Sequence, residues 1–322
     1  MFHSLISYDR QFSRFNSTRG ITERRTMMET PRPLDLEDAT LELIRRASTI
    51  LPSDVTAALR TAQTREIQGS AAEQALASIL QNVSMATDDS TPVCQDTGTL
   101  IFHIYYPFGY STRTIIEQIK RATIRATESA YLRPNAVDSL SGKNSGNNLG
   151  AGSPQFHFHE WDKESILVKL LLKGGGSENV CAQYKLPDSR LKAGRNLDGV
   201  RKAVIDAVFA AQGKGCSPGI IGVCIGGDRG SGYMAAKEQL FRQMDDTNPD
   251  PELASLETRI YDEINELGIG PMGFGGKTTV IGVKMTALHR LPASFFVSVA
   301  YLCWAGRRAS MTISDGEVTY HA

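Results

Sequence analysis

The order of hydrophobic and polar residues predicts a mainly helical first part of the chain, from about residue 36 to residue 131. Ser70 and, three residues later, Glu73 match a capping box, which predicts a helix over 70–80. Apolar residues recur at helical spacing over 115–132. Between these helices, TLIFHIYY at 99–106 alternates in the manner of a strand.

The rest of the chain mixes strand-like runs with helical ones. We expect strands at 155–161, 165–173 and 219–227, and helices at 197–212, 232–244 and 251–267. Two later stretches, 268–285 and 292–308, combine glycine turns with β-branched or aromatic runs. The pattern predicts a mixed α/β (α+β) fold, with a helical N-terminal part packed on a mixed β-sheet part with flanking helices.

A long polar loop separates the two regions. Residues 133–153 are rich in Asn, Gly and Ser. Because structureless loops of this length are uncommon inside compact domains and often functional, we expect this one to serve a site.

Composition excludes several classes of protein. The 322 residues have a formal net charge of zero, which gives no general attraction to nucleic acid or to an anionic membrane. No apolar run approaches the roughly 20 residues that cross a bilayer. We expect a cytoplasmic protein without nucleic-acid or membrane partners.

The first 26 residues carry most of their charge as arginine: Arg10, Arg14, Arg19, Arg24 and Arg25. Two interpretations remain open, a disordered extension and a weak organelle-targeting segment that would direct mitochondrial import. We therefore predict an extension over 1–30 and one domain over 31–322.

Three of the five cysteines lie in loops at the ends of predicted strands: Cys94 in PVCQDTG, Cys216 in GKGCSPG and Cys303 in YLCWAGRR. An odd count without a CxxC pair is untypical of a disulfide scaffold or a zinc ribbon. Thiolates suit iron–sulfur clusters, and a cubane held by three of them leaves one iron open as a Lewis acid. The alternative is that each is a small buried hydrophobe, which suits Cys181 and Cys224 better.

Polar neighbours of these cysteines are candidates for substrate contacts. Asp96 could exchange a proton with a substrate or simply close a turn, and Gln95 could donate its amide to a carboxylate. Arg133 could bind a carboxylate through two hydrogen bonds or cap a helix. The glycines at 174–176 would let backbone N–H groups approach an anion, or form a flexible turn.

Other patterns point to different chemistry. Residues 230–235 match G-x-G-x-x-A, part of a dinucleotide fingerprint, but Gly226 and Gly227 already interrupt the preceding strand. His157 and His159 share one strand face, which favours a solvent-facing or partner-facing edge. His289 is a candidate for a substrate-binding or a surface histidine.

Together, the motifs resemble those of one family. The chain is similar to the α subunit, or N-terminal domain, of the class I iron–sulfur hydro-lyases, fumarate hydratase and L(+)-tartrate dehydratase. The resemblance rests on PVCQDTG (92–98), LRPNAVDSLSGKNSGNN (132–148), KGGGSEN (173–179), GCSPGIIGVCIGG (215–227), GIGPMGFGGKTT (268–279) and CWAGRR (303–308).

The resemblance implies roles for particular residues. It assigns a [4Fe–4S] cluster to Cys94, Cys216 and Cys303, a catalytic role to Asp96, and substrate contacts to Gln95, Arg133, the Gly176 backbone and His289. Ser217 stands where the family has a proline, and Cys224 where a glycine is common; neither change removes a ligand.

The resemblance also implies a substrate and a partner. It points to a small dicarboxylate, with fumarate favoured over tartrate, and to a separate β subunit that completes the site in an αβ hetero-oligomer. Two readings of another class stay open, a nucleotide-binding enzyme that uses residues 230–235 and a non-catalytic partner subunit.

Overall fold

The computed structural model describes residues 35–321, of which 35–36 precede the first helix. The predicted extension over 1–30 and its boundary lie outside the described residues, so both stay predictions. The helices are α1 (Glu37–Thr49), α2 (Ser53–Arg65), α3 (Ala71–Asp88), α4 (Thr112–Glu128), α5 (Gly175–Asn179), α6 (Leu197–Ala211), α7 (Arg229–Glu238) and α8 (Pro251–Asn265), with short 3-10 turns η1 (Gln212–Gly215), η2 (Gln239–Phe241) and η3 (Pro271–Gly273). The strands are β1 (Thr99–Tyr106), β2 (Gln155–Glu160), β3 (Ile166–Lys173), β4 (Ala182–Lys185), β5 (Gly219–Gly226), β6 (Val280–Leu288), β7 (Phe296–Leu302), β8 (Arg308–Ser314) and β9 (Glu317–His321).

The first sheet has the strand order β2-β1-β3-β8-β9. Strands β1 and β2 are parallel, and the remaining pairs are antiparallel. Alternate residues of β1, such as Phe102 and Ile104, are buried against α1 and α4, where they meet Leu43 and Ile119. Because successive strand residues point to opposite faces, His103 and Tyr105 lie on the other face.

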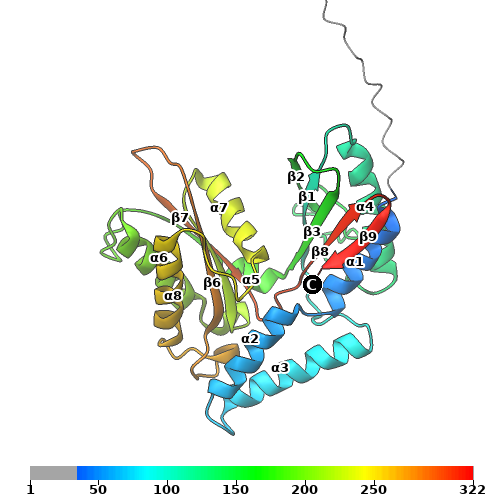
Figure 1. The fold of residues 1–322 in the computed structure, drawn as a ribbon. Helices are drawn as coiled ribbons and strands as arrows, with labels where there is room; N and C mark the ends of the chain where they lie inside the picture. Colours follow the sequence, from blue (N-terminus) through cyan, green and yellow to red (C-terminus); the bar gives the residue numbers. More distant parts are fainter. Residues whose placement is uncertain (1–34, 322) are drawn as a thin grey trace, which may run out of the picture. The chain divides into compact units, whose positions relative to one another are not determined.

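The second sheet has the order β4-β7-β5-β6, and helices cover both of its faces. Helices α6 and α8 pack on one face, and α7 packs on the other (Figure 1). All eight residues of β5 are buried, as expected for a strand covered on both sides. Gly222 allows the close approach of α7, because a Cβ there would lie 2.1 Å from the carbonyl oxygen of Ala236.

Helices α2 and α3 join the two sheets. Their apolar residues share one core with Ile101 and Leu171 of the first sheet and with Ile220 and Leu302 of the second. The chain also crosses between the sheets twice, from β3 to β4 and from β7 to β8. The backbone N–H of Leu172 donates to the carbonyl of Arg307 at 2.9 Å, which holds the two crossings side by side.

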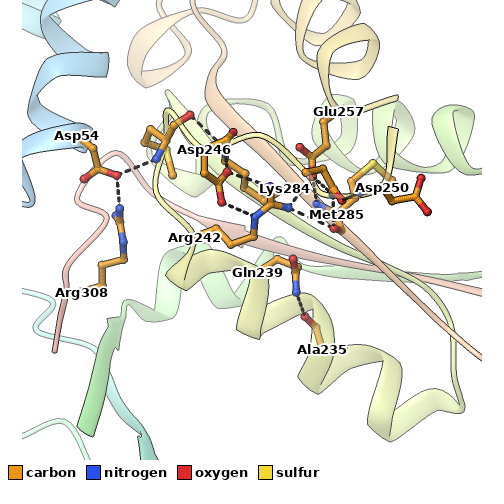
Figure 2. A network of polar contacts seen from close by, with 12 residues as sticks. Asp54, Ala235, Gln239, Arg242, Asp246, Asp250, Glu257, Lys284, Met285 and Arg308 are labelled. Atoms are coloured by element: carbon orange, nitrogen blue, oxygen red, sulfur yellow. Dashed lines mark hydrogen bonds and ion pairs between the residues drawn. The ribbon is translucent and has the colours of Figure 1, made fainter. Parts of the chain in front are cut away.

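A polar network reinforces this junction (Figure 2). Asp54, in the first turn of α2, forms an ion pair with Arg308 of β8 and accepts a hydrogen bond of 2.8 Å from the backbone N–H of Met244. Lys284 of β6 donates to the Met244 carbonyl at 3.1 Å and to Asp246 at 2.5 Å. The N-terminus of α2 is thus bonded to β8 of the first sheet and to the segment at Met244, which Lys284 of the second sheet holds in place.

The predicted fold class is confirmed: the protein is an α+β structure with helices around two mixed sheets. The strand predicted at 99–106 has those bounds in the structure. Helix α4 begins at Thr112, earlier than the predicted 115, because Ser111 caps it by accepting a hydrogen bond from the N–H of Thr114 at 3.3 Å. The short strand β4 and the C-terminal pair β8–β9 were not predicted.

Candidate metal centre

The three loop cysteines lie at neighbouring ends of elements. Cys94 lies in the bend between α3 and β1, Cys216 lies between η1 and β5, and Cys303 directly follows β7. The antiparallel register pairs Ile220 with Leu302, so the segments that carry Cys216 and Cys303 meet at one edge of the second sheet. A hydrogen bond of 3.2 Å from the N–H of Trp304 to the carbonyl of Cys216 joins them.

Cys94 contributes to the raised pKa values of both Cys216 and Cys303, which indicates that the three sulfur atoms lie near one another. Burial raises the pKa of Cys216, and the neighbouring Cys94 and Asp96 raise it further. Burial also raises the pKa of Cys303; the Arg307 guanidinium opposes this, and Cys216 and Cys94 add to it. The raised pKa values favour the protonated thiols of Cys216 and Cys303 when no cation is bound, and metal binding would release those protons.

The backbone of Cys216 has an uncommon conformation that directs its side chain. Its φ of 56° and ψ of 64° lie in the left-handed region, which non-glycine residues rarely adopt. The flanking Gly215 and Gly219 lie against the ring of Tyr301, where added Cβ atoms would come within 2.5 and 2.4 Å of ring carbons. The loop is thus packed flat on one aromatic ring, and larger residues at either glycine would displace the thiol.

Arg307 supplies positive charge to this centre. It is only 1% exposed, and its Nε and Nη1 have no hydrogen-bond partner within residues 35–321. Its Nη2 lies close to the turn at Gly174, 3.7 Å from where a Cβ would be. A buried guanidinium without a carboxylate partner requires another anion, and a cluster bound through thiolates is one. The residues present therefore fit an anionic metal–sulfur group.

Asp96 is held in one orientation beside the cysteines. Its Oδ2 accepts a hydrogen bond of 2.7 Å from the N–H of Gly175, and its Oδ1 accepts one of 3.1 Å from the N–H of Gly98. Gly98 has a φ of 81°, and a Cβ there would lie 2.6 Å from the carbonyl carbon of Lys173. This close approach brings the bend after Cys94 against the turn after β3.

Two other predicted substrate contacts, Gln95 and Gly176, lie near the bend after Cys94 and the turn after β3. Gln95 is exposed, with its Oε1 3.9 Å from the Sγ of Cys94. The exposed Gly176 backbone lies in α5, with its Cβ position 3.7 Å from the carbonyl oxygen of Lys214 in η1. The structure therefore brings Gln95 and Gly176 to the segments that hold Cys94 and Cys216.

Arg133 is brought to the site through its backbone. Its N–H donates to the hydroxyl of Thr97 at 3.1 Å, directly after Asp96, and its carbonyl accepts from the amide of Asn148 at 3.0 Å. The Arg133 side chain is exposed. The start of the long polar loop is thus fastened beside Thr97, and Asn148 from its later part is bonded to that start.

His289 is not brought together with the cysteines. It is exposed and follows Leu288, which pairs with Gly226 at the far end of β5, whereas Cys216 precedes the near end at Gly219. The eight residues of β5 span about 23 Å at about 3.3 Å per residue. Its substrate role stays a prediction, and His289 itself lies at the end of the sheet opposite Cys216.

The remaining sequence candidates lie outside the centre. Cys224 is buried in the middle of β5, and burial raises its pKa to about 11. In the G-x-G-x-x-A segment, the N–H groups of Gly230 and Ser231 donate to the carboxylate of Asp228 at 2.7 and 3.0 Å. The first turn of α7 is therefore already capped, which disfavours a phosphate there.

Sequence reasoning missed three residues of the centre: Thr97, Tyr301 and Arg307. Arg307 stands four positions after the third cysteine, and its charge beside an apolar run was a usable signal. Thr97 lies inside PVCQDTG, but nothing local to Thr97 or Tyr301 shows its role, because that role comes from contacts with segments distant in the chain.

Comparison of the sequence with known proteins gives the family of the chain. Residues 37–312 match the family model described as Fumarate hydratase (Fumerase). The chain belongs to this family, which confirms the resemblance drawn from its motifs. Within residues 35–321, no helix is long and apolar enough to cross a membrane.

Named relatives fall into two groups. The chain is 52% identical over 288 residues to a "Putative fumarate hydratase class I" of Geobacillus stearothermophilus, a match that covers 88% of this chain and 56% of that protein. It is 34% identical over 283 residues to a "Putative L(+)-tartrate dehydratase subunit alpha" of Methanocaldococcus jannaschii, covering 86% and 96%. It is 29% identical over 271 residues to the "L(+)-tartrate dehydratase subunit alpha" of Escherichia coli strain K12, covering 83% and 86%. This chain thus spans little more than half the length of the Geobacillus relative.

Proposed function

We propose that the chain is the cluster-bearing α part of a hydro-lyase that reversibly hydrates fumarate to malate. The observation that carries the proposal is the convergence of Cys94, Cys216 and Cys303 beside buried Arg307, whose Nε and Nη1 have no hydrogen-bond partner within residues 35–321. Family membership and the Geobacillus relative named as a class I fumarate hydratase support it.

The three cysteines would hold a [4Fe–4S] cluster through their thiolates. Such a cluster supplies a Lewis acid at its fourth iron, which suits loss or addition of a hydroxyl group next to a carboxylate. The chain's own contribution is positioning. Arg307 balances the charge of the thiolates, and the Tyr301 ring supports the loop that presents Cys216.

Asp96 would move the proton in this site. Two backbone N–H groups fix its carboxylate beside Cys216, so that it meets a bound substrate in one orientation. Gln95, the Gly176 backbone and the exposed guanidinium of Arg133 would bind the substrate carboxylates. His289 would belong to this set only if the substrate or a partner chain reached the far edge of the second sheet.

A β-type partner would complete the site. The names "subunit alpha" of the archaeal and Escherichia coli relatives support a two-part assembly, as does the additional length of the Geobacillus relative. We propose an αβ hetero-oligomer acting on a small dicarboxylate.

A second candidate is L(+)-tartrate dehydration, favoured by the names of the relatives at 34% and 29% identity. The two substrates differ by one hydroxyl group. The higher identity to the Geobacillus protein favours fumarate.

The test uses the full chain purified anaerobically together with its partner subunit. The complex is reconstituted with iron and sulfide, and its iron content and its dehydration activity are then measured. We expect bound iron and acid-labile sulfide, and malate dehydration faster than tartrate dehydration. A colourless chain without iron, or a coloured complex inactive on both acids, would overturn the proposal. Nicotinamide binding without iron would support the nucleotide alternative instead.

A further inference from the structure

A second group of potential ligands lies on the first sheet, away from the three cysteines. His103 of β1 and His159 of β2 lie on the sheet face opposite α1 and α4, and Glu238 at the end of α7 reaches them. The parallel register sets His103 beside His157 and Tyr105 beside His159. The sequence pattern favoured a solvent-facing or partner-facing edge for the β2 histidines; in the structure their rings are half-buried and pack against His103 and Tyr105 of β1.

The ligand atoms converge. His103 Nδ1 lies 3.2 Å from His159 Nε2 and 3.9 Å from Glu238 Oε1, and the three ligand atoms all lie within 4.8 Å of one another. Two nitrogens bound tetrahedrally to zinc at about 2.0–2.1 Å are about 3.3 Å apart. The histidine pair therefore already has the separation of two zinc ligands. The Glu238 side chain, 44% exposed at a helix end, can rotate to close the remaining distance.

The surroundings hold the two rings in place. Tyr105 stacks on His159 with ring centroids 4.5 Å apart, and its hydroxyl donates to Glu238 at 3.4 Å. A hydrogen bond from a second residue to a ligating carboxylate is a common feature of metal sites. His103 is 5% exposed; burial, with His157, His159 and Lys169 adding to it, lowers its pKa to about 3, which keeps the ring neutral.

A hydrogen bond between the rings accounts for the 3.2 Å separation, and the Tyr105 hydroxyl accounts for one contact of Glu238; a shared cation would satisfy all three ligand atoms at once. We propose that His103, His159 and Glu238 bind a zinc ion through two imidazole nitrogens and one carboxylate, with a fourth position open to water. Nitrogen ligands select against magnesium and calcium, which prefer oxygen. Because Lys169 opposes a cation here, binding depends on the Glu238 carboxylate.

The test measures zinc affinity of the full chain by competition with a chromophoric chelator. Zinc also binds thiolates, so the measurement uses the Cys216→Ser chain beside the wild type. We expect one zinc per chain that survives Cys216→Ser and is weakened at least about tenfold by His159→Gln and by Glu238→Gln, since loss of even an outer partner costs that much. His157→Gln is the matched control, a neighbouring ring on the same strand face, and should leave the affinity unchanged.

Cobalt substitution and crystallography give independent readouts. Cobalt in the Cys216→Ser chain should show visible bands of nitrogen and oxygen ligation without thiolate charge transfer, and zinc anomalous scattering should lie between His103 and Glu238. Circular dichroism confirms that each variant is folded. Zinc bound only at the cysteines, affinity unaffected by both ligand variants, or equal weakening by His157→Gln would overturn the proposal.

Discussion

The carboxylate of Asp96 accepts a hydrogen bond of 2.7 Å from the backbone N–H of Gly175, a residue 79 positions further along the chain. This bond fastens the bend that carries Cys94 to the turn that leaves the first sheet. Lys173, just before the turn, is 2% exposed and forms an ion pair of 2.7 Å with Glu178 of α5, just after it, which also stabilises the turn. The geometry of the centre therefore depends on contacts between distant segments, and the predictions below test those contacts.

Gly98→Ala should destabilise the protein and displace Asp96. The substitution adds a Cβ 2.6 Å from the Lys173 carbonyl carbon at a φ of 81°, so we expect a loss of about 2–5 kcal/mol in the free energy of unfolding. Denaturant unfolding measures it. Gly69→Ala is the control, because Gly69 has a similar φ of 77° but open space, and should cost about 1–2 kcal/mol. Equal losses at the two glycines would show that the contact with Lys173 is unimportant.

Cys216→Ser should abolish iron binding at the centre. A serine hydroxyl is a poor replacement for a soft thiolate, so reconstituted iron and sulfide should fall to background. Cys224→Ser, in the middle of the buried strand β5, removes a thiol without touching the centre and should keep the cluster if the chain folds. Iron and sulfide analysis decides the matter. Retention of a full cluster in Cys216→Ser would remove this cysteine from the ligand set.

Arg307→Met should separate folding from cluster binding. The buried guanidinium has no carboxylate partner within the described residues, so removing its charge should leave the unfolding free energy of the metal-free chain unchanged or raise it. Its loss should also raise the pKa of Cys303, since Arg307 lowers it, and thereby weaken the cluster. Reconstitution at several pH values, with unfolding of the metal-free chain, measures both. A variant that loses stability but keeps full iron content would contradict the assignment.

Asp54→Asn should destabilise the junction between the sheets. Arg308, 7% exposed on its side chain, would lose its charged partner, and breaking a buried pair costs about 3–5 kcal/mol. The exposed pair Arg113–Glu117 offers a control: Arg113→Gln should change stability by less than about 0.5 kcal/mol. Chemical denaturation of both variants is the measurement. If Asp54→Asn and Arg113→Gln lowered the free energy of unfolding by similarly small amounts, the ion pair with Arg308 would not contribute, and Asp54 would act only through its hydrogen bond to Met244.

Asp246→Asn should make the free energy of unfolding depend less on pH in the acid range. Burial raises the pKa of Asp246, but hydrogen bonds from Arg242 and Lys284 outweigh it, so the folded pKa lies below its ordinary value of 3.8. A depressed folded pKa means that the stabilisation is complete above about pH 5 and is lost as the pH falls through the folded value. The difference in unfolding free energy between wild type and variant should therefore shrink as the pH falls from about 5 through the folded pKa of Asp246. A difference that stays constant with pH would contradict the role of this charge.

Much of the local structure follows from local sequence. Strand β1 has its predicted bounds because TLIFHIYY is rich in β-branched and aromatic residues and is bounded by Gly98 and Pro107. Helix α3 begins after Ser70, whose side chain accepts from the N–H of Glu73 at 3.2 Å as the capping pattern predicts. Strands β8 and β9 escaped prediction because RASMTIS and EVTYH mix polar and apolar residues; β8 has one partly exposed face, and β9 is a mostly exposed edge strand.

The sequence alone determined which residues could do the chemistry: three cysteines beside glycine turns, an Asp after the first of them, and motifs specific enough to name the family. Tertiary structure alone decided where they meet. Antiparallel pairing of β5 with β7 joins Cys216 to Cys303, whereas parallel pairing of β5 with β6 carries His289 to the opposite edge. It also buries Arg307 with no carboxylate partner among the described residues, and it sets His103 beside His157 of β2. Strand direction and register are properties of pairs of segments, and no single stretch of sequence contains them.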